Sequence, residues 1–249
     1  MTQHVQPIRP AATVILVREA QPQFEILMLK RSASSAFAGG MYVFPGGRVD
    51  NDDHLQLYAS MARGPDERQA AQVAAIGHEY LGYWIASVRE CFEEAGILLA
   101  YDGSGQLVTH DLPGLADLRR RLNAGELLFE DVCRQAGVTL ALDRIHFHNR
   151  VVTPLGRPRR FDTRFFIAHA PDRQADSHDD VETVDSVWLS PEEALRRHAD
   201  GTFGLMRVTE RQLQTLSRHR RAADVVAMAV AQQQFQVQRP VLPPGDAPG

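Results

Sequence analysis

The sequence is poor in several features, and each shortage excludes a class of protein. Its two cysteines, Cys91 and Cys133, are too few for a disulfide framework or a four-cysteine zinc site. No apolar run approaches the roughly 20 residues that a membrane-spanning helix needs. Residues 1–10 also lack the apolar core of a signal peptide. We therefore expect a cytoplasmic protein with reduced cysteines and no membrane partner.

Lysine is almost absent as well. Lys30 is the only lysine, so arginine supplies 26 of the 27 basic side chains. The 31 acidic side chains give a net charge of −4, which argues against a dedicated nucleic-acid partner. A coding bias accounts for much of this arginine excess. Some arginines could also serve to bind phosphate, because a guanidinium group binds phosphate through two parallel hydrogen bonds.

The order of apolar patterns predicts one α+β domain with a mixed sheet. We expect a flexible N-terminus over residues 1–10, a single domain over 11–235 and a flexible Pro/Gly-rich tail over 236–249. Apolar, β-branched runs predict strands at 11–17, 24–29, 41–44, 145–153, 161–168 and 184–189. Helical periodicity and capping signals predict helices at 67–77, 83–94, 115–122 and 127–135, one beginning at 190, and one or two within 209–233.

Three acidic residues share one face of the predicted helix 83–94. At 100° per residue, Glu90, Glu93 and Glu94 fall within an arc of about 100°. The apolar residues of the segment occupy the other side. Such a stripe is usually a solvated helix face. It also suits a hard divalent cation, which prefers oxygen ligands. The stripe alone leaves both interpretations open.

The context of the stripe resembles the Nudix hydrolase family, whose signature is G-x5-E-x7-R-E-U-x-E-E-x-G-U, with U apolar. The sequence Phe-Pro-Gly-Gly ends at Gly47, which matches the opening glycine. The second half of the signature is matched by Arg89, Glu90, Glu93, Glu94, Gly96 and Ile97. Gly47 and Arg89 are 89 − 47 = 42 positions apart, against 14 in the family, so 28 residues are inserted, at about 51–77. Counted back from Arg89, the family's middle glutamate falls on Leu81, and Glu79 and Asp50 are candidate replacements.

An interrupted signature of this kind resembles the coenzyme A diphosphatase-like branch of the family. That resemblance implies a mixed sheet sandwiched between helices, a helical insertion and a helical C-terminal extension. It implies hydrolysis of coenzyme A or acyl-coenzyme A to 3′,5′-ADP and a 4′-phosphopantetheine compound. The branch's separate coenzyme A signature has an arginine where this chain has Ala36. An ADP-ribose or nucleotide-sugar pyrophosphatase and a catalytically silent Nudix-like binding module are the alternatives.

The resemblance also assigns roles to individual residues. It implies that the catalytic residues are Arg89, Glu90 and Glu93, and that Arg89 orients the neighbouring side chains. Mg²⁺ or Mn²⁺ would be held by Glu90, Glu93, Glu94, the Gly46 carbonyl and Glu182. The substrate would be bound by Arg31, Gly47, Arg150, Arg159, Arg160 and Arg164. The expected ligand is a small nucleotide-containing molecule, and a homodimer is left open. The general base is not identified.

Two further groups of residues lie in the second half of the chain. Five arginines fall within 15 positions, at 150, 157, 159, 160 and 164, and suit a ligand rich in phosphate such as coenzyme A. Each is otherwise an ordinary residue of a solvated loop or strand. His146 and His148 alternate along the predicted strand 145–153. They are either substrate contacts or ordinary half-buried histidines, since no third metal ligand lies at a helpful spacing.

Overall fold

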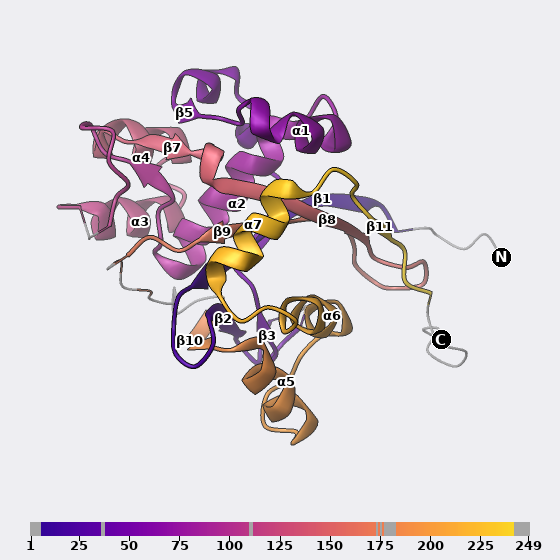
Figure 1. Ribbon diagram of the computed structural model, residues 1–249. Coiled ribbons are helices and arrows are strands. Elements are labelled where there is room, and N and C mark those ends of the chain that lie inside the picture. The colour runs from indigo at the N-terminus through magenta and orange to yellow at the C-terminus, as the bar shows by residue number, and fades with distance from the viewer. Residues whose placement is uncertain are drawn as a thin grey trace.

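The computed structural model of the protein describes residues 6–35, 38–109, 112–172, 174, 176 and 183–241. In these ranges an eight-stranded mixed sheet lies between two groups of helices (Figure 1). Its strands are β1 (Ile8–Arg18), β2 (Glu25–Arg31), β3 (Tyr42–Val43), β4 (Gly46–Arg48), β8 (Ile145–Val152), β9 (Arg160–His169), β10 (Thr183–Leu189) and β11 (Val237–Gln238). The main order is β10-β2-β1-β9-β8-β11, with β3 on β2 and β4 on β1. The pairs β1–β9 and β8–β11 are parallel, so the predicted mixed sheet is confirmed.

Helices cover both faces of this sheet. On one side lie α1 (Ala70–Ile76), α2 (Tyr80–Ala95), α3 (Leu115–Asn123) and α4 (Phe129–Ala136). On the other lie α5 (Pro191–Ala199), α6 (Arg207–Leu216) and α7 (Ala222–Ala231). Figure 1 shows α1 and α4 above the level of the sheet, α3 at its left, and α5 and α6 below it. The sandwich of a sheet between helices is confirmed, as is the helical C-terminal part.

A smaller sheet joins the upper layer. It has the order β5-β7-β6, formed by β5 (Ala62–Arg63), β7 (Thr139–Ala141) and β6 (Ala100–Tyr101). Short 3-10 helices flank it, namely η1 (Asn51–His54), η2 (Gln56–Ser60), η3 (Glu67–Gln69) and η4 (Leu142–Arg144). With α1, the first three of these make the inserted segment helical, as predicted. No helix in the described ranges has both the length and the apolarity that crossing a bilayer requires.

Strand β1 is apolar on both faces because it is central and covered on both sides. Ala12, Val14 and Leu16 belong to the core on the α2 side, and Ile15 and Val17 belong to the core under α5, α6 and α7. All five side chains are buried. The continuous apolar run in the sequence therefore reflects one strand that serves two separate cores.

Helix α2 is anchored by its apolar face. Trp84, Val88 and Phe92 are buried in the core, and the Trp84 indole donates to the carbonyl of Ile145 at 2.8 Å. Gly96 adopts a left-handed conformation with φ 72° and ends the helix at the predicted place. Because the apolar face is fixed against the sheet, the C-terminal half of α2 presents its acidic residues towards β4 and η1.

Two predicted boundaries are wrong. Strand β1 begins at Ile8, so the last residues of the predicted flexible N-terminus belong to the sheet. Val237–Gln238 pairs with Arg150 and Val151 of β8, although both residues were expected in a flexible tail. A two-residue strand has almost no intrinsic pattern, and its existence depends on the exposed edge that β8 offers.

Candidate active site

Strand register brings the glycine pair against the acidic end of α2. Gly46 pairs with Thr13 and Gly47 with Ala12 at the centre of the sheet. The Gly46 amide donates to Glu94 Oε2 at 2.8 Å. A Cβ atom on Gly47 would lie 2.5 Å from both carboxylate oxygens of Glu90. Glycine at position 47 therefore allows the Glu90 carboxylate to lie directly against the backbone of β4.

Arg89 connects the residues of the site. Its Nη1 donates to Glu90 Oε1 at 3.0 Å and to Glu93 Oε2 at 2.9 Å, the neighbour one helical turn on. Its Nη2 also donates to the carbonyl of Arg48 at 2.9 Å. The side chain is only 9% exposed. The orienting role predicted for Arg89 matches this geometry, since one guanidinium holds two of the carboxylates and the end of β4.

A further acid, which the sequence analysis missed, completes this network. Asp53 accepts from Arg89 Nε and Nη2, both at 2.8 Å, and its side chain is 1% exposed. Its Oδ2 also accepts the Asp50 amide at 2.8 Å at the start of η1. Of the two predicted replacements for the middle glutamate, Glu79 is exposed and Asp50 lies 3.6 Å from Arg89 with a side chain that is 54% exposed. The buried partner of Arg89 is Asp53.

A signal for Asp53 was present in the sequence. Counting six positions forward from Gly47, as the family signature does, leads to residue 53. The backward count from Arg89 crosses the insertion and therefore leads to Leu81 instead. The inserted residues thus begin after Asp53 and not at residue 51, and both halves of the signature are intact on either side of them.

The electrostatics of the site favour an additional cation. Burial raises the pKa of Glu90 well above its ordinary value, and the charges of Glu94 and Glu93 raise it further, against the opposing effect of Arg89. Burial raises the pKa of Glu93 as well, while Arg89 opposes this. Arg31 Nη1 lies 3.8 Å from Glu94 Oε1. The carboxylates of Asp53, Glu90, Glu93 and Glu94 are therefore crowded around the guanidinium groups of two arginines, Arg89 and Arg31.

The donor chemistry of this site fits a divalent metal ion. Carboxylate oxygens are the ligands that Mg²⁺ and similar hard cations prefer, and three of them come from adjacent turns of one helix. Among the residues that the structure describes, no three His, Cys, Asp or Glu side chains are already arranged to hold a metal. Glu182, the other side chain predicted as a ligand, lies outside the described residues. A ligand role for the Gly46 carbonyl stays a prediction.

Two of the predicted substrate-binding arginines lie in the same row of the sheet as Gly47. Ala12 pairs with Gly47 on one side and with Arg164 on the other, and Arg164 pairs with Arg150. Paired residues point to the same face of a sheet, and Arg164 lies two strand spacings, or about 10 Å, from Gly47, while Arg150 lies three spacings, or about 14 Å, from it. Arg164 and Arg150 therefore lie beside the glycine pair, on the face that α2 covers.

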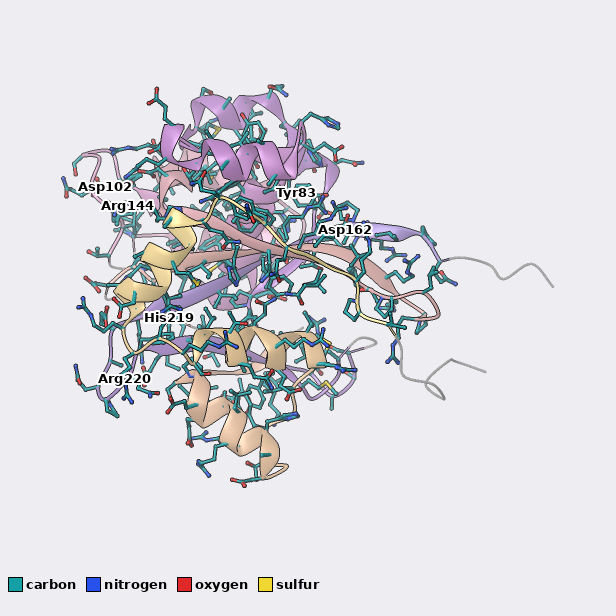
Figure 2. All side chains as sticks on the ribbon, turned by 45° about the vertical axis from the view of Figure 1, so that its right-hand side comes forward. Tyr83, Asp102, Arg144, Asp162, His219 and Arg220 are labelled. Atoms are coloured by element: carbon teal, nitrogen blue, oxygen red, sulfur yellow. The ribbon has the colours of Figure 1, made fainter. Side chains whose placement is uncertain are left out.

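Asp162 and Tyr83 hold these arginines in place. Asp162 accepts from Arg150 at 2.6 and 2.7 Å and forms an ion pair with Arg164 at 2.8 Å. The Arg164 guanidinium lies 4.1 Å from the centroid of the Tyr83 ring on α2. Figure 2 shows Tyr83 and Asp162 near each other on the right-hand side of the molecule. Since one carboxylate serves two guanidinium groups, the group retains a net positive charge.

The remaining predicted arginines differ in position. Arg160 is buried, and its guanidinium donates to the carbonyls of Thr153 and Gln6 at 3.2 and 3.4 Å. Arg159 is exposed on the loop between β8 and β9. The structure thus brings Arg31, Arg150 and Arg164 towards the acidic group. It places Arg160 at the first residue of β9 and Arg159 in the loop just before that strand.

Comparisons with known proteins bear on this arrangement. The family described as the NUDT19 Nudix domain matches residues 8–206. The acyl-coenzyme A diphosphatase NUDT19 of Gallus gallus is 30% identical over 236 residues, covering 76% of this chain and 62% of that protein. NUDT19 of Homo sapiens is 30% identical over 206 residues, covering 69% of this chain and 54% of that protein. The chain thus spans between half and two thirds of the length of these curated relatives.

A solved structure is also similar over most of its length. The crystal structure of a NUDIX hydrolase from Alicyclobacillus acidocaldarius superimposes with a TM-score of 0.78 at 26% sequence identity. The match covers 89% of this chain and 96% of that one. The fold as a whole therefore has a counterpart in a known structure.

Proposed function

Because the chain belongs to the Nudix hydrolase family, we propose that it is a metal-dependent diphosphatase that acts on coenzyme A or acyl-coenzyme A. Water would add across the diphosphate, forming one P–O bond and breaking the bridging one, to give 3′,5′-ADP and a 4′-phosphopantetheine compound. The observation that carries the proposal is the group of Glu90, Glu93 and Glu94 beside the glycine pair, in which Arg89 contacts two of the carboxylates. The similarity to proteins named acyl-coenzyme A diphosphatase supports the substrate.

Glu90, Glu93 and Glu94 are the residues that would hold Mg²⁺ or Mn²⁺. A bound divalent cation neutralises diphosphate charge and lowers the pKa of water at the site. Arg89 fixes the carboxylates of Glu90 and Glu93, so that they need little reorganisation when the substrate arrives. Gly47 lets the diphosphate and the Glu90 carboxylate approach the backbone closely.

The arginines of the sheet would bind the charged end of the substrate that does not react. Arg150 and Arg164 carry more positive charge than Asp162 neutralises, and a phosphate monoester suits such a pair. We assign them to the 3′-phosphate of coenzyme A. Arg31, on the other side of the glycine pair, is assigned to the diphosphate itself. These roles depend on the proposed substrate and are tested with it.

A substrate panel tests the proposed activity. We expect hydrolysis of coenzyme A and short acyl-coenzyme A esters in the presence of Mg²⁺ or Mn²⁺, and at least about tenfold lower kcat/KM for ADP-ribose, NADH and dinucleoside polyphosphates. Products are separated by chromatography and identified as 3′,5′-ADP and the phosphopantetheine compound. Turnover of ADP-ribose without turnover of coenzyme A would overturn the substrate assignment. Metal binding without hydrolysis of any panel member would favour a silent binding module.

Arg164→Gln tests the assigned phosphate contact. We expect the KM for coenzyme A to rise about tenfold with kcat nearly unchanged, because a charge-assisted hydrogen bond contributes about 1.5 kcal/mol or more. The effect should disappear with 3′-dephospho-coenzyme A as substrate. Arg196→Gln, at an exposed arginine on α5, is the control. An equal rise in KM for both substrates would contradict the assignment, and a melting curve of each variant reports on folding.

A further inference from the structure

A second cavity lies away from the candidate active site. It has a volume of about 450 Å³, within the range of small-molecule sites. His169, which lines it, lies five residues beyond Arg164 on β9, or about 16 Å along the strand. Figure 2 shows Arg144, another lining residue, on the left of the molecule, and Tyr83 and Asp162 on the right. The cavity is therefore distinct from the region around the glycine pair.

The cavity combines an apolar wall with a rim of arginines. Apolar surface is supplied by Leu99, just before β6, by Ala141 of β7, and by Val226 and Val230 of α7. The rim carries three arginines, namely Arg63, Arg68 and Arg144. Arg63 and Arg68 come from the inserted segment, which therefore supplies part of the cavity lining. A smaller depression of about 310 Å³ adjoins it and shares Arg63 and Arg144.

Arg144 differs from the other two arginines. Arg63 Nε lies 3.5 Å from Asp143, and Arg68 Nη2 lies 2.6 Å from Asp66. Arg144 donates its Nε to the Tyr101 hydroxyl at 3.1 Å. In the described part of the chain, no carboxylate lies within 4.0 Å of its guanidinium group. The Tyr101 hydroxyl in turn donates to Asp143, which lines the cavity together with Asp172. Arg144 therefore differs from the other two rim arginines in having no direct ion pair within the described residues.

His146 adds an uncharged side chain to the cavity lining. It is 7% exposed. Burial lowers the pKa of His146 to about 4, and the charge of Arg68 lowers it further, so the ring is neutral near pH 7. Its Nδ1 is buried without a hydrogen-bond partner in the described structure, and because this atom is inaccessible to solvent it does not face the open cavity.

We propose that this cavity is a second, non-catalytic binding site for a small organic phosphate. The phosphate contacts Arg144 and Arg68 at the rim, and the apolar body of the ligand packs against Leu99, Ala141 and Val230. Phosphate is favoured over carboxylate because three arginines line the cavity, and the three oxygens of a phosphate monoester can accept from more than one guanidinium group. The proposal stands on the cavity itself and does not depend on the reaction assigned to the other site.

Calorimetric titration with phenyl phosphate tests the site in the full-length protein without added metal. We expect saturable binding of phenyl phosphate and at least tenfold weaker binding of inorganic phosphate, which lacks the apolar body, and of benzoate, which carries a carboxylate. Arg144→Gln should weaken phenyl phosphate binding at least tenfold. Arg120→Gln, at an exposed arginine on α3 that pairs with Asp117, is the matched control and should bind like the wild-type protein.

Two more variants locate the bound molecule. Val230→Trp fills the cavity from α7 without changing a charge, and we expect it to abolish binding. Glu93→Gln changes the candidate active site, and we expect phenyl phosphate to bind this variant as it binds the wild-type protein. Loss of binding in Glu93→Gln with full binding in Arg144→Gln would place the ligand at the active site and overturn the proposal. Absence of saturable binding at millimolar phenyl phosphate, or equal affinity for benzoate, would overturn it as well.

Discussion

Glu93→Gln and Glu94→Gln are each expected to lower kcat/KM for the proposed substrate by at least about 100-fold. Loss of residues that only support a metal site costs about 10- to 100-fold, and the loss of a metal ligand should cost more. Glutamine keeps the size of the side chain but removes its negative charge. Because burial disfavours the charged form of Glu93, the amide should leave the fold intact.

Initial rates with Mn²⁺, together with electron paramagnetic resonance of unbound Mn²⁺, check this expectation. The second measurement reports on metal binding independently of activity. Glu192→Gln, at an exposed glutamate near the start of α5, is the control and should retain the wild-type rate. Near-normal rates and Mn²⁺ binding in both active-site variants would remove the argument for a metal at this position.

Asp53→Asn is expected to destabilise the protein by about 3 kcal/mol or more. Asp53 and Arg89 form a buried pair with two hydrogen bonds of 2.8 Å, and an amide NH2 in place of one carboxylate oxygen would leave a buried N–H group of the charged Arg89 without its acceptor. For a protein of this size the loss corresponds to a fall in Tm of roughly 6–12 °C. Activity should fall as well, because Arg89 would no longer be held in the position from which it orients Glu90 and Glu93.

Asp50→Asn is the matched control for this prediction. Asp50 lies three residues away and 3.6 Å from the same guanidinium, but its side chain is 54% exposed. Ion pairs at exposed positions contribute about 0–1 kcal/mol. Urea unfolding of both variants measures how much each carboxylate contributes to the free energy of unfolding. Similar losses of stability would show that Asp53 has no special role, whereas partial recovery in Asp53→Glu would support the need for a carboxylate there.

The parts of the site that are local in the sequence were predictable. The acidic stripe, Arg89 and Gly96 lie on one helix, so helical geometry alone places them relative to one another. The strands were predictable because buried strands are apolar over several consecutive residues. These properties need no knowledge of which segments meet in space.

The parts that depend on contact between distant segments were not predictable in the same way. The pairing of Asp53 with Arg89 joins residues 36 positions apart, and the insertion between them hides it from a count made backward from Arg89. The role of Asp162 as shared partner of Arg150 and Arg164 follows from the register of β8 and β9. The arginine cluster was visible in the sequence, but the acid within it was not recognised as a partner for two of its members.

The link between Asp53 and Arg89 has a consequence for the length of the chain between them. The ion pair holds together the two ends of the inserted segment, which leaves the signature after Asp53 and returns to it before Arg89. The segment between them is therefore a closed loop. The entropy of closing a loop grows only with the logarithm of its length, at about 0.6 kcal/mol for each doubling. With this pair in place, extra residues in the exposed turns of the inserted segment should therefore add little to the entropy of loop closure. Its buried residues Tyr58, Gln69 and Gln72 are different, because they fix the segment to the rest of the fold.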